Sequence, residues 1–320
     1  MNKILITGGC GFIGSHVVEF FFSKYKNSKI IVYDKITYAG NARYLNKIVK
    51  SNRLKIIKKD INDFNSLLKY TKKVDLLIHM AAESHVDNSF ESAKKFIDTN
   101  VQGTRSVLDA CRVNKIKKII HVSTDEIYGE IYKGSFSENS NFNPSNPYSS
   151  SKAAAEMIIK GYQHSFKLNI TIVRANNIFG ERQHPEKLIG ACCCAILKKE
   201  FINLHGNGLQ KRTFLYVKDF AEALYRITKL KNKNEIFNIG TNFEYKNIDV
   251  VKLIVKKFNK EFKNVVKFVQ DRPFNDHRYS INIDKIKKLN WHPKHRLEDK
   301  MHEIINWYKV NFKLFKYPKK

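Results

Sequence analysis

The chain has 320 residues, and its 58 Lys and Arg against 30 Asp and Glu give a formal net charge of +28. Hydrophobic residues make up 42% of the sequence and aromatic residues 12%, a composition that indicates a folded globular protein and excludes a disordered basic tail. No apolar run reaches the length of a membrane-spanning helix, and the five cysteines form no CxxC pair. We therefore expect no membrane segment, no metal site and no disulfide framework, and we expect a reducing compartment such as the cytoplasm.

Lysine carries most of the positive charge. Eleven of the 58 positive residues are arginine, which leaves 58 − 11 = 47 lysines. Arginine is the residue preferred for contacts with phosphates and bases, and no block of five or six consecutive like charges occurs. The sequence therefore favours a solvated lysine-rich surface over a nucleic-acid site.

Short apolar runs alternate with longer amphipathic stretches from the N-terminus onward. The alternation predicts strands at 4–6, 30–33, 54–58, 76–78, 119–122, 170–173 and 235–239. It predicts helices at 12–26, at 148–168, at 250–262, and from Ser89 or Ser92 to Val113. The pattern is typical of a doubly wound parallel α/β sheet with a smaller C-terminal α/β substrate domain. We place the first domain at 1–175 plus about 213–242, and the second at 176–212 and 243–320.

A glycine-rich turn follows the first predicted strand. Gly8, Gly11 and Gly14 open the first helix, where glycine permits a tight turn and lets a pyrophosphate approach the helix N-terminus. Asp34 ends the second strand, 20 residues after Gly14, where a carboxylate binds an adenosine ribose and repels a 2′-phosphate. Asp60 ends the third strand, near the expected adenine. These positions predict a dinucleotide site that prefers NAD to NADP.

A Tyr-x-x-x-Lys pair begins the long helix after residue 147. Tyr148 and Lys152 lie on one helix face, where an ammonium lowers the pKa of a neighbouring phenol. Thr124 ends the fifth strand, and Asp125 and Glu126 follow it directly. Two carboxyls beside such a pair are more than an alcohol oxidation needs, and they suit a general acid and a general base for an elimination.

These residues resemble a known family. The glycine turn, Thr124, Tyr148 and Lys152 resemble the extended short-chain dehydrogenases/reductases, and Thr-Asp-Glu-x-Tyr-Gly at 124–129 is similar to the signature of dTDP-glucose 4,6-dehydratases. Further segments that resemble that family are 33–41, 81–87, 176–177, 185–189, 212–217 and 271–279. The sequence departs from the family at Glu181, at Phe274 and Asn275, and at the three cysteines 192–194.

The resemblance implies the reaction of a Rossmann-fold lyase. Tyr148, assisted by Lys152, would take the proton of the sugar C4 hydroxyl, whose oxygen Thr124 holds, while NAD accepts the C4 hydride. Glu126 would then remove the C5 proton and Asp125 would protonate the leaving C6 hydroxyl. The hydride returns to C6, so that a tightly bound NAD is regenerated and the product is a nucleotide-linked 4-keto-6-deoxyglucose.

The resemblance also implies two sets of contacts. The residues expected to bind NAD are Gly8, Gly11, Phe12, Ile13, Gly14, Asp34, Lys35, Thr37, Ala39, Gly40, Asp60, Ile61, Ala81, Ala82, Ser84, Thr99, Tyr148 and Lys152. The residues expected to bind the nucleotide sugar are Ser84, Thr124, Asn177, Lys187, Leu188, Asn203, His205, Arg212, Asn247, Arg272, Asn275 and Arg278. His205 gives a slight preference for UDP over dTDP. Members of the family dimerise through two helices, here 91–113 and 148–168, and lead toward 6-deoxyhexoses such as rhamnose.

Two other functions stay open at this point. A 4-epimerase or a UDP-glucuronate decarboxylase would share Tyr148 and Lys152 without needing two carboxyls. A non-catalytic Rossmann protein that binds nucleic acid through its lysines would need neither residue.

Overall fold

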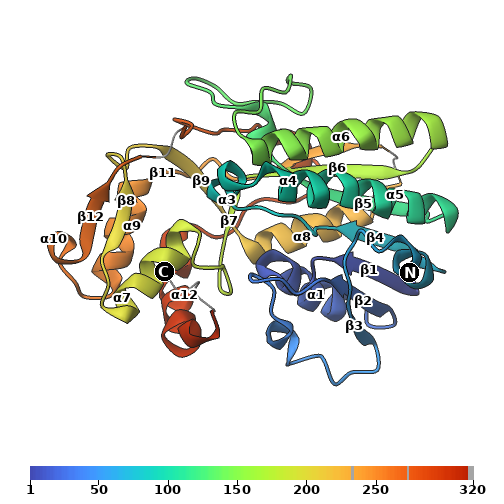
Figure 1. Cartoon of the computed structure of the whole chain (residues 1–320), viewed down its shortest axis with the longest axis horizontal. Coiled ribbons are helices and arrows are strands. Elements are labelled where there is room, and N and C mark those ends of the chain that lie inside the picture. The colour runs from blue at the N-terminus through green and yellow to red at the C-terminus, as the bar shows by residue number, and fades with distance from the viewer. Residues whose placement is uncertain (232–233, 272–273, 316–320) are drawn as a thin grey trace.

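The computed structural model describes residues 1–231, 234–271 and 274–315, and within them a parallel seven-stranded sheet forms the larger part of the molecule (Figure 1). Its strands, in spatial order, are β10 (Ile236–Ile239), β6 (Ile170–Ala175), β5 (Lys118–Thr124), β4 (Leu76–His79), β1 (Lys3–Thr7), β2 (Lys29–Asp34) and β3 (Leu54–Lys58). All seven predicted strands are present, and the predicted doubly wound fold is confirmed.

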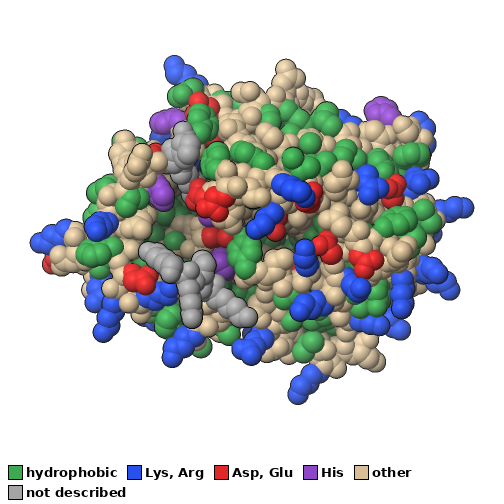
Figure 2. All heavy atoms as spheres, viewed as in Figure 1, with side chains coloured by type: hydrophobic (Ala, Val, Ile, Leu, Met, Phe, Trp, Pro, Cys, Tyr) green, Lys and Arg blue, Asp and Glu red, His purple; other side chains and the backbone are tan. Residues whose placement is uncertain are grey.

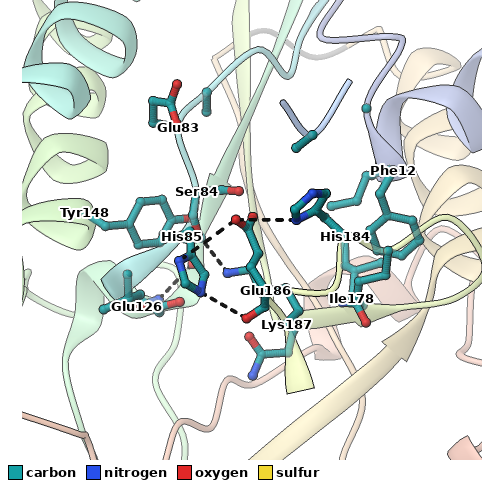
Figure 3. A pocket seen from close by; sticks show the side chains of 18 of the residues that line it. Phe12, Glu83, Ser84, His85, Glu126, Tyr148, Ile178, His184, Glu186 and Lys187 are labelled. Carbon is teal, nitrogen blue, oxygen red and sulfur yellow. Dashed lines mark hydrogen bonds and ion pairs between the residues drawn. The ribbon is translucent and has the colours of Figure 1, made fainter. Parts of the chain in front are cut away.

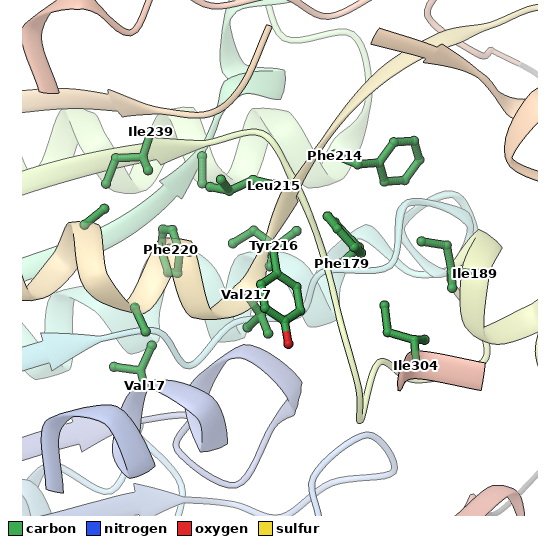
Figure 4. Close-up of a cluster of buried hydrophobic side chains, with 14 of the residues drawn as sticks. Val17, Phe179, Ile189, Phe214, Leu215, Tyr216, Val217, Phe220, Ile239 and Ile304 are labelled. Carbon is green, nitrogen blue, oxygen red and sulfur yellow. The ribbon is translucent and has the colours of Figure 1, made fainter. Parts of the chain in front are cut away.

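Alternate side chains of the central strands enter two separate cores. Ile4 and Ile6 belong to the core under α1 (Phe12–Lys24) and α8 (Val217–Thr228), whereas Leu5 belongs to the core under α2 (Phe64–Thr71), α5 (Gly103–Val113) and α6 (Pro147–Phe166). Because both faces are covered, the inner strands carry apolar residues on both faces instead of alternating strictly between apolar and polar residues. Figure 4 shows part of the first core, where Val17, Phe220 and Ile239 lie on α1, α8 and β10.

The rest of the chain forms smaller sheets beside the carboxyl end of the main sheet. One contains β11 (Glu244–Lys246), β9 (Lys211–Tyr216) and β7 (Asn177–Phe179), and the other pairs β12 (Val266–Val269) with β8 (Ile202–His205). The helices of this part are α7 (Leu188–Lys198), α9 (Asn247–Lys257), α10 (Phe262–Val265), α11 (Asp284–Lys287) and α12 (Leu297–Asn311). Short 3-10 turns lie at η1 (Ala42–Leu45), η3 (Asp125–Tyr128) and η4 (Phe312–Leu314).

Two predicted helices are interrupted. The helix expected at 250–262 ends at Lys257, because Asn259 adopts a left-handed φ of 53° and the Lys260 N–H turns back to the Val255 carbonyl. The helix expected to end at Val113 consists of α3 (Val86–Glu91), α4 (Ala93–Phe96), a π-helical segment η2 (Ile97–Gln102) and α5.

The order of the strands reverses between β1 and β4. Chain connections leave these two strands toward opposite faces, so a crevice opens at their carboxyl ends, where doubly wound sheets bind ligands. The glycine turn, Ala81 and Thr124 all lie at this edge, facing the smaller sheets. Among the described residues, no helix combines the length and hydropathy that crossing a membrane would require.

Candidate active site

A cavity of about 530 Å³ lies between the carboxyl edge of the main sheet and the smaller sheets. Its volume is in the range of sites that hold small molecules and cofactors. Figure 2 shows a face hollowed between two lobes, with acidic and histidine side chains in the hollow and lysine and arginine side chains around the outline. Among the described residues, no three His, Cys, Asp or Glu side chains are grouped so that they could hold a metal ion.

The glycine turn forms one end of the cavity because side chains would not fit in it. Gly8 has a φ of +71°, and a Cβ there would lie 2.7 Å from the Ala81 backbone nitrogen. A Cβ on Gly14 would lie 2.0 Å from the Gly8 carbonyl oxygen. The turn therefore packs directly on the end of β4 and leaves the N-terminus of α1 facing the cavity, an arrangement that binds a pyrophosphate.

Acidic residues at the ends of β2 and β3 lie where the adenosine of a bound dinucleotide is expected. The carboxylate of Asp34 accepts the backbone N–H groups of Cys10 at 2.8 Å and Ile36 at 2.7 Å. Lys35 forms an ion pair of 2.7 Å with Asp60, so its charge is already compensated within the protein. An ionised Asp34 beside a compensated Lys35 fits the ribose diol of NAD better than a 2′-phosphate.

Two buried carboxyls follow the end of β5. Burial raises the pKa of Asp125 to about 7, and the neighbouring Glu126 adds to the rise. Burial also raises the pKa of Glu126, while Lys187 and Arg212 oppose that rise. Glu126 lines the cavity, whereas Asp125 lies just behind its wall and is 4% exposed. The two groups thus differ in environment, as an acid and a base for one reaction should.

Tyr148 and Lys152 lie on the first turns of α6, which Asn146 caps and Pro147 begins. The Lys152 ammonium donates to the Val122 carbonyl at 2.8 Å, and burial lowers its pKa to about 8. Burial raises the pKa of Tyr148, and Glu126 adds to the rise. The sequence reasoning expected Lys152 to lower that pKa. Burial of the phenol is the main reason for the difference, the carboxyls of Glu126 and Asp125 add to it, and the Lys152 ammonium binds the Val122 carbonyl.

The opposite wall of the cavity carries cations and amides. Lys187 donates to the Ser84 carbonyl at 2.8 Å, and Arg212 donates to the Asn275 side chain at 3.0 Å. Arg212 also lies over the ring of Tyr279, 4.6 Å from its centroid. Two placed cations on one wall are suited to a diphosphate.

The structure brings most of the expected residues to this one cavity. The predicted NAD contacts that line it are Gly8, Gly11, Phe12, Ile13, Gly14, Asp34, Lys35, Thr37, Ala39, Gly40, Asp60, Ile61, Ala81, Ala82, Ser84, Thr99, Tyr148 and Lys152. The predicted substrate contacts that line it are Ser84, Thr124, Asn177, Lys187, Leu188, Asn203, His205, Arg212, Asn247 and Asn275. Arg278 is not among the lining residues, because its guanidinium binds Glu244 and the Gly134 carbonyl. Arg272 lies outside the described residues.

Sequence reasoning missed a cluster that joins the two halves of the cavity wall (Figure 3). His85, just before α3, hydrogen-bonds the Glu186 carbonyl at 3.0 Å, and His184 lies 3.6 Å from the Glu186 carboxylate. Burial acts to raise the pKa of Glu186, but His184, His85 and Lys187 together hold it below its usual value. Only the grouping of acidic, basic and histidine residues at 184–187 could have suggested this cluster.

Several known proteins match this chain in sequence over most of its length. The sequence profile described as GDP-mannose 4,6-dehydratase matches residues 5–304. A dTDP-D-glucose 4,6-dehydratase from Dictyostelium discoideum is 38% identical, with 97% of this chain and 82% of that protein covered. The human dTDP-D-glucose 4,6-dehydratase is 39% identical over 97% and 91% of the two chains.

Solved structures of related enzymes also match the fold of this chain. A dTDP-glucose 4,6-dehydratase from Streptomyces venezuelae, solved with NAD and TYD bound, has a TM-score of 0.95 and 33% identity, covering 98% and 99% of the two chains. A UDP-glucose 4-epimerase from Thermotoga maritima, solved with UDP-glucose, is more distant, with a TM-score of 0.88 and 26% identity over 97% and 99%.

Proposed function

This chain belongs to the nucleotide-sugar 4,6-dehydratase family, and from that membership we propose how its cavity dehydrates dTDP-glucose or UDP-glucose. The enzyme is an NAD-dependent hydro-lyase that yields the nucleotide-linked 4-keto-6-deoxyglucose. The observation that carries the proposal is the presence of two buried carboxyls, Asp125 and Glu126, in the same site as Tyr148 and Lys152.

Oxidation at C4 depends on Tyr148. Its phenolate takes the proton of the C4 hydroxyl, and Thr124, which hydrogen-bonds Tyr148, holds the same substrate oxygen. Because burial raises the pKa of Tyr148, a phenolate there requires nearby positive charge. Lys152, one helical turn along α6 and on the same cavity wall, is the cation that we assign to this role. NAD, when bound, supplies the hydride acceptor for C4 and the donor for C6.

Elimination at C5 and C6 depends on the two carboxyls. A 4-keto group acidifies the C5 proton, which Glu126 removes as general base from the cavity wall. Asp125, whose pKa burial raises to about 7, is partly protonated at neutral pH and gives its proton to the departing C6 hydroxyl. The products of this step are water and the unsaturated ketone that is reduced at C6.

The opposite wall holds the nucleoside diphosphate. Lys187 and Arg212 take the phosphates, and Asn177, Leu188, Asn203, His205, Asn247 and Asn275 surround the remainder. Both nucleotides stay candidates, because thymine differs from uracil by one methyl group, worth about 1–3 kcal/mol of discrimination. The Arabidopsis relatives named as trifunctional UDP-glucose 4,6-dehydratases also form rhamnose precursors, and we place this enzyme in deoxysugar biosynthesis.

Incubation of the purified enzyme with dTDP-glucose and with UDP-glucose tests the proposal. We expect a 4-keto-6-deoxy product from at least one of them, and competition between the two gives the preferred nucleotide. As a control, Glu126→Gln should retain NAD and lose the incorporation of solvent deuterium at C5. An epimerised or decarboxylated product, or no product from either substrate, would contradict the proposal.

We also propose that two copies of the chain associate through the segments 91–113 and 148–168, that is, through α4, η2, α5 and α6; α5 and α6 lie side by side in Figure 1. Exposed apolar side chains occur on these elements and on the preceding α3, namely Phe90, Ile97, Val113, Met157 and Phe166. Burial of such a patch favours association.

A cytoplasmic location is supported by the five cysteines, all of which are buried as free thiols. NAD should stay bound throughout turnover, because its release in the reduced state would stop the reaction before C6 is reduced.

A further inference from the structure

Each of the two carboxyls of η3 is faced by one asparagine. Asn176 follows β6, and its amide nitrogen donates to Oδ2 of Asp125 over 2.6 Å. Asn146 precedes α6; burial raises the pKa of Glu126, and a hydrogen bond from the Asn146 side chain is among the contacts that oppose this rise. Both asparagines are buried, with exposed fractions of 3% and 6%.

A backbone contact fixes the orientation of the Asn176 side-chain amide. An asparagine amide can in general be turned by half a rotation, which exchanges its donor and its acceptor. Here the Thr241 backbone N–H donates to Oδ1 of Asn176 at 3.0 Å, and a backbone N–H can only meet the carbonyl oxygen. A Cβ on residue 240 would lie 1.8 Å from the same oxygen, so Gly240 leaves the space that this oxygen occupies. The amide nitrogen must therefore face Asp125.

This orientation decides which oxygen of Asp125 carries the acidic proton. The amide N–H of Asn176 is a donor without acceptor capacity, so Oδ2 of Asp125 must remain the accepting atom. The Thr124 hydroxyl lies 3.4 Å from Oδ1 and donates to it when Asp125 is ionised, but a hydroxyl can also accept, so the proton of the acid form resides on Oδ1 and turns toward Thr124. Oδ1 is therefore the oxygen next to Thr124, which lines the cavity, and a general acid must hold its proton on the side of the substrate.

Asn146 is fixed in the same way. Its Oδ1 accepts the Ser149 backbone N–H at 2.9 Å, and the Asn146 backbone N–H donates to the Ser149 hydroxyl at 3.2 Å. The two bonds form the capping box of α6, which leaves the amide nitrogen free to donate to Glu126. A donor favours the ionised form of a carboxyl, and a general base must be ionised.

We propose that Asn176 and Asn146 are positioning residues for the elimination: Asn176 places the proton of Asp125 on Oδ1, and Asn146 supplies a fixed donor to the carboxyl of Glu126. The inference rests on the roles given to Asp125 and Glu126 in the proposed function. Both asparagines line the cavity, and each acts through the carboxyl that it faces. Each acts by a hydrogen bond whose direction the backbone imposes.

Other charged groups also act on the two carboxyls. Asp125 is influenced by Glu126, Arg212 and Tyr148. Glu126 is influenced by Lys187, Arg212, Asp276 and Tyr279. The asparagines differ from these groups because they carry no charge and are locked by backbone donors.

The principal test is Asn176→Asp, which keeps the shape of the side chain and its acceptor for Thr241. The substitution replaces the amide donor by a second carboxyl beside Asp125. We expect kcat to fall by about tenfold or more, the usual scale for losing a hydrogen bond to an acidic group. The alkaline limb of the kcat–pH profile should move to higher pH, because a like charge raises the pKa of the general acid.

Asn114→Asp is the matched control. It makes the same chemical change at an amide that donates to the Leu68 carbonyl and the Thr71 hydroxyl, between α5 and α2. It should lower the melting temperature and leave the pH profile of kcat unchanged. A purely structural role of Asn176 would give this same result, and finding it for Asn176→Asp would overturn the proposal.

Asn146→Ser provides a second, independent measurement that does not depend on the stability of the first variant. Serine is a good N-cap, but it is too short to reach Glu126. We expect NAD content and C4 oxidation to persist, while deuterium incorporation at C5 slows about tenfold. Unchanged incorporation would refute the role of Asn146. Absence of any keto product from the unmodified enzyme would instead refute the proposed function.

Discussion

The raised pKa of Asp125 serves the proposed reaction and lowers the stability of the folded protein. Burial raises its pKa to about 7, so the folded protein binds a proton at pH values where the unfolded chain has already lost it. Stability from such a group is present below the unfolded pKa and is lost as the pH rises through the folded value. Above pH 7 the folded protein therefore holds a buried carboxylate beside Glu126.

Asp125→Asn removes this dependence on pH. An amide keeps an oxygen for the Asn176 donor and places an N–H near the Thr124 hydroxyl. We expect little change in melting temperature at pH 5 and a rise of a few degrees at pH 8, together with loss of dehydration. Thermal unfolding at the two pH values measures the effect, and an equal shift at both would contradict it.

The chemical residues of the site were predictable, but their contacts were not. Spacing and residue type indicated Gly8, Asp34, Tyr148 and Lys152, because turns, strand ends and helix faces follow local rules. Arg278 shows the limit of that reasoning. Its partner Glu244 is 34 residues away, and only the packing of the smaller sheets brings the two side chains together.

At the scale of elements, strands were more predictable than helices. A fully buried strand is recognisable from a short apolar run alone, and all seven runs formed strands of the main sheet. Helix continuity depends on neighbours. The π-helical segment at 97–102 ends at Gly103, where an added Cβ would lie 2.4 Å from the Ile61 side chain. A hydrophobic pattern in the sequence does not reveal this close contact.

One buried ion pair connects the side chains of β6 and α6. Arg174 and Glu156 are 2.7 Å apart with almost no exposure, and Arg174 also donates to the Tyr128 hydroxyl of η3. The pair therefore connects the sheet and α6 to the element that carries the two carboxyls.

Glu156→Gln should destabilise the fold by about 3 kcal/mol, because it leaves the Arg174 guanidinium buried without a counter-charge. Denaturant unfolding measures the loss. Asp98→Asn is the control, since its exposed pair with Lys94 is worth about 0.5 kcal/mol. A loss at Glu156 no larger than that at Asp98 would show that the buried pair does not hold these elements together.

At the scale of the whole molecule, the net charge of +28 causes repulsion between positive side chains, and few of these side chains belong to the active site. Lys187, Arg212 and Lys152 are the cations of the cavity wall that the reaction uses, against 58 positive residues in the chain. At the amino edge of the sheet, burial lowers the pKa of Lys3, and the charges of Lys29, Lys55 and Lys73 lower it further. Like charges there destabilise the compact state.

Lys29→Glu should relieve that repulsion. Lys29 is exposed at the start of β2, so the gain is below about 1 kcal/mol and should appear as a higher melting temperature at low ionic strength. Because salt screens exposed charges, the gain should shrink as salt is added, while the unmodified enzyme itself becomes more stable. Lys94→Gln, which removes a lysine already paired with Asp98, should give no gain at any salt concentration. A melting temperature of the unmodified enzyme that falls with salt would show that its ion pairs outweigh its lysine repulsion.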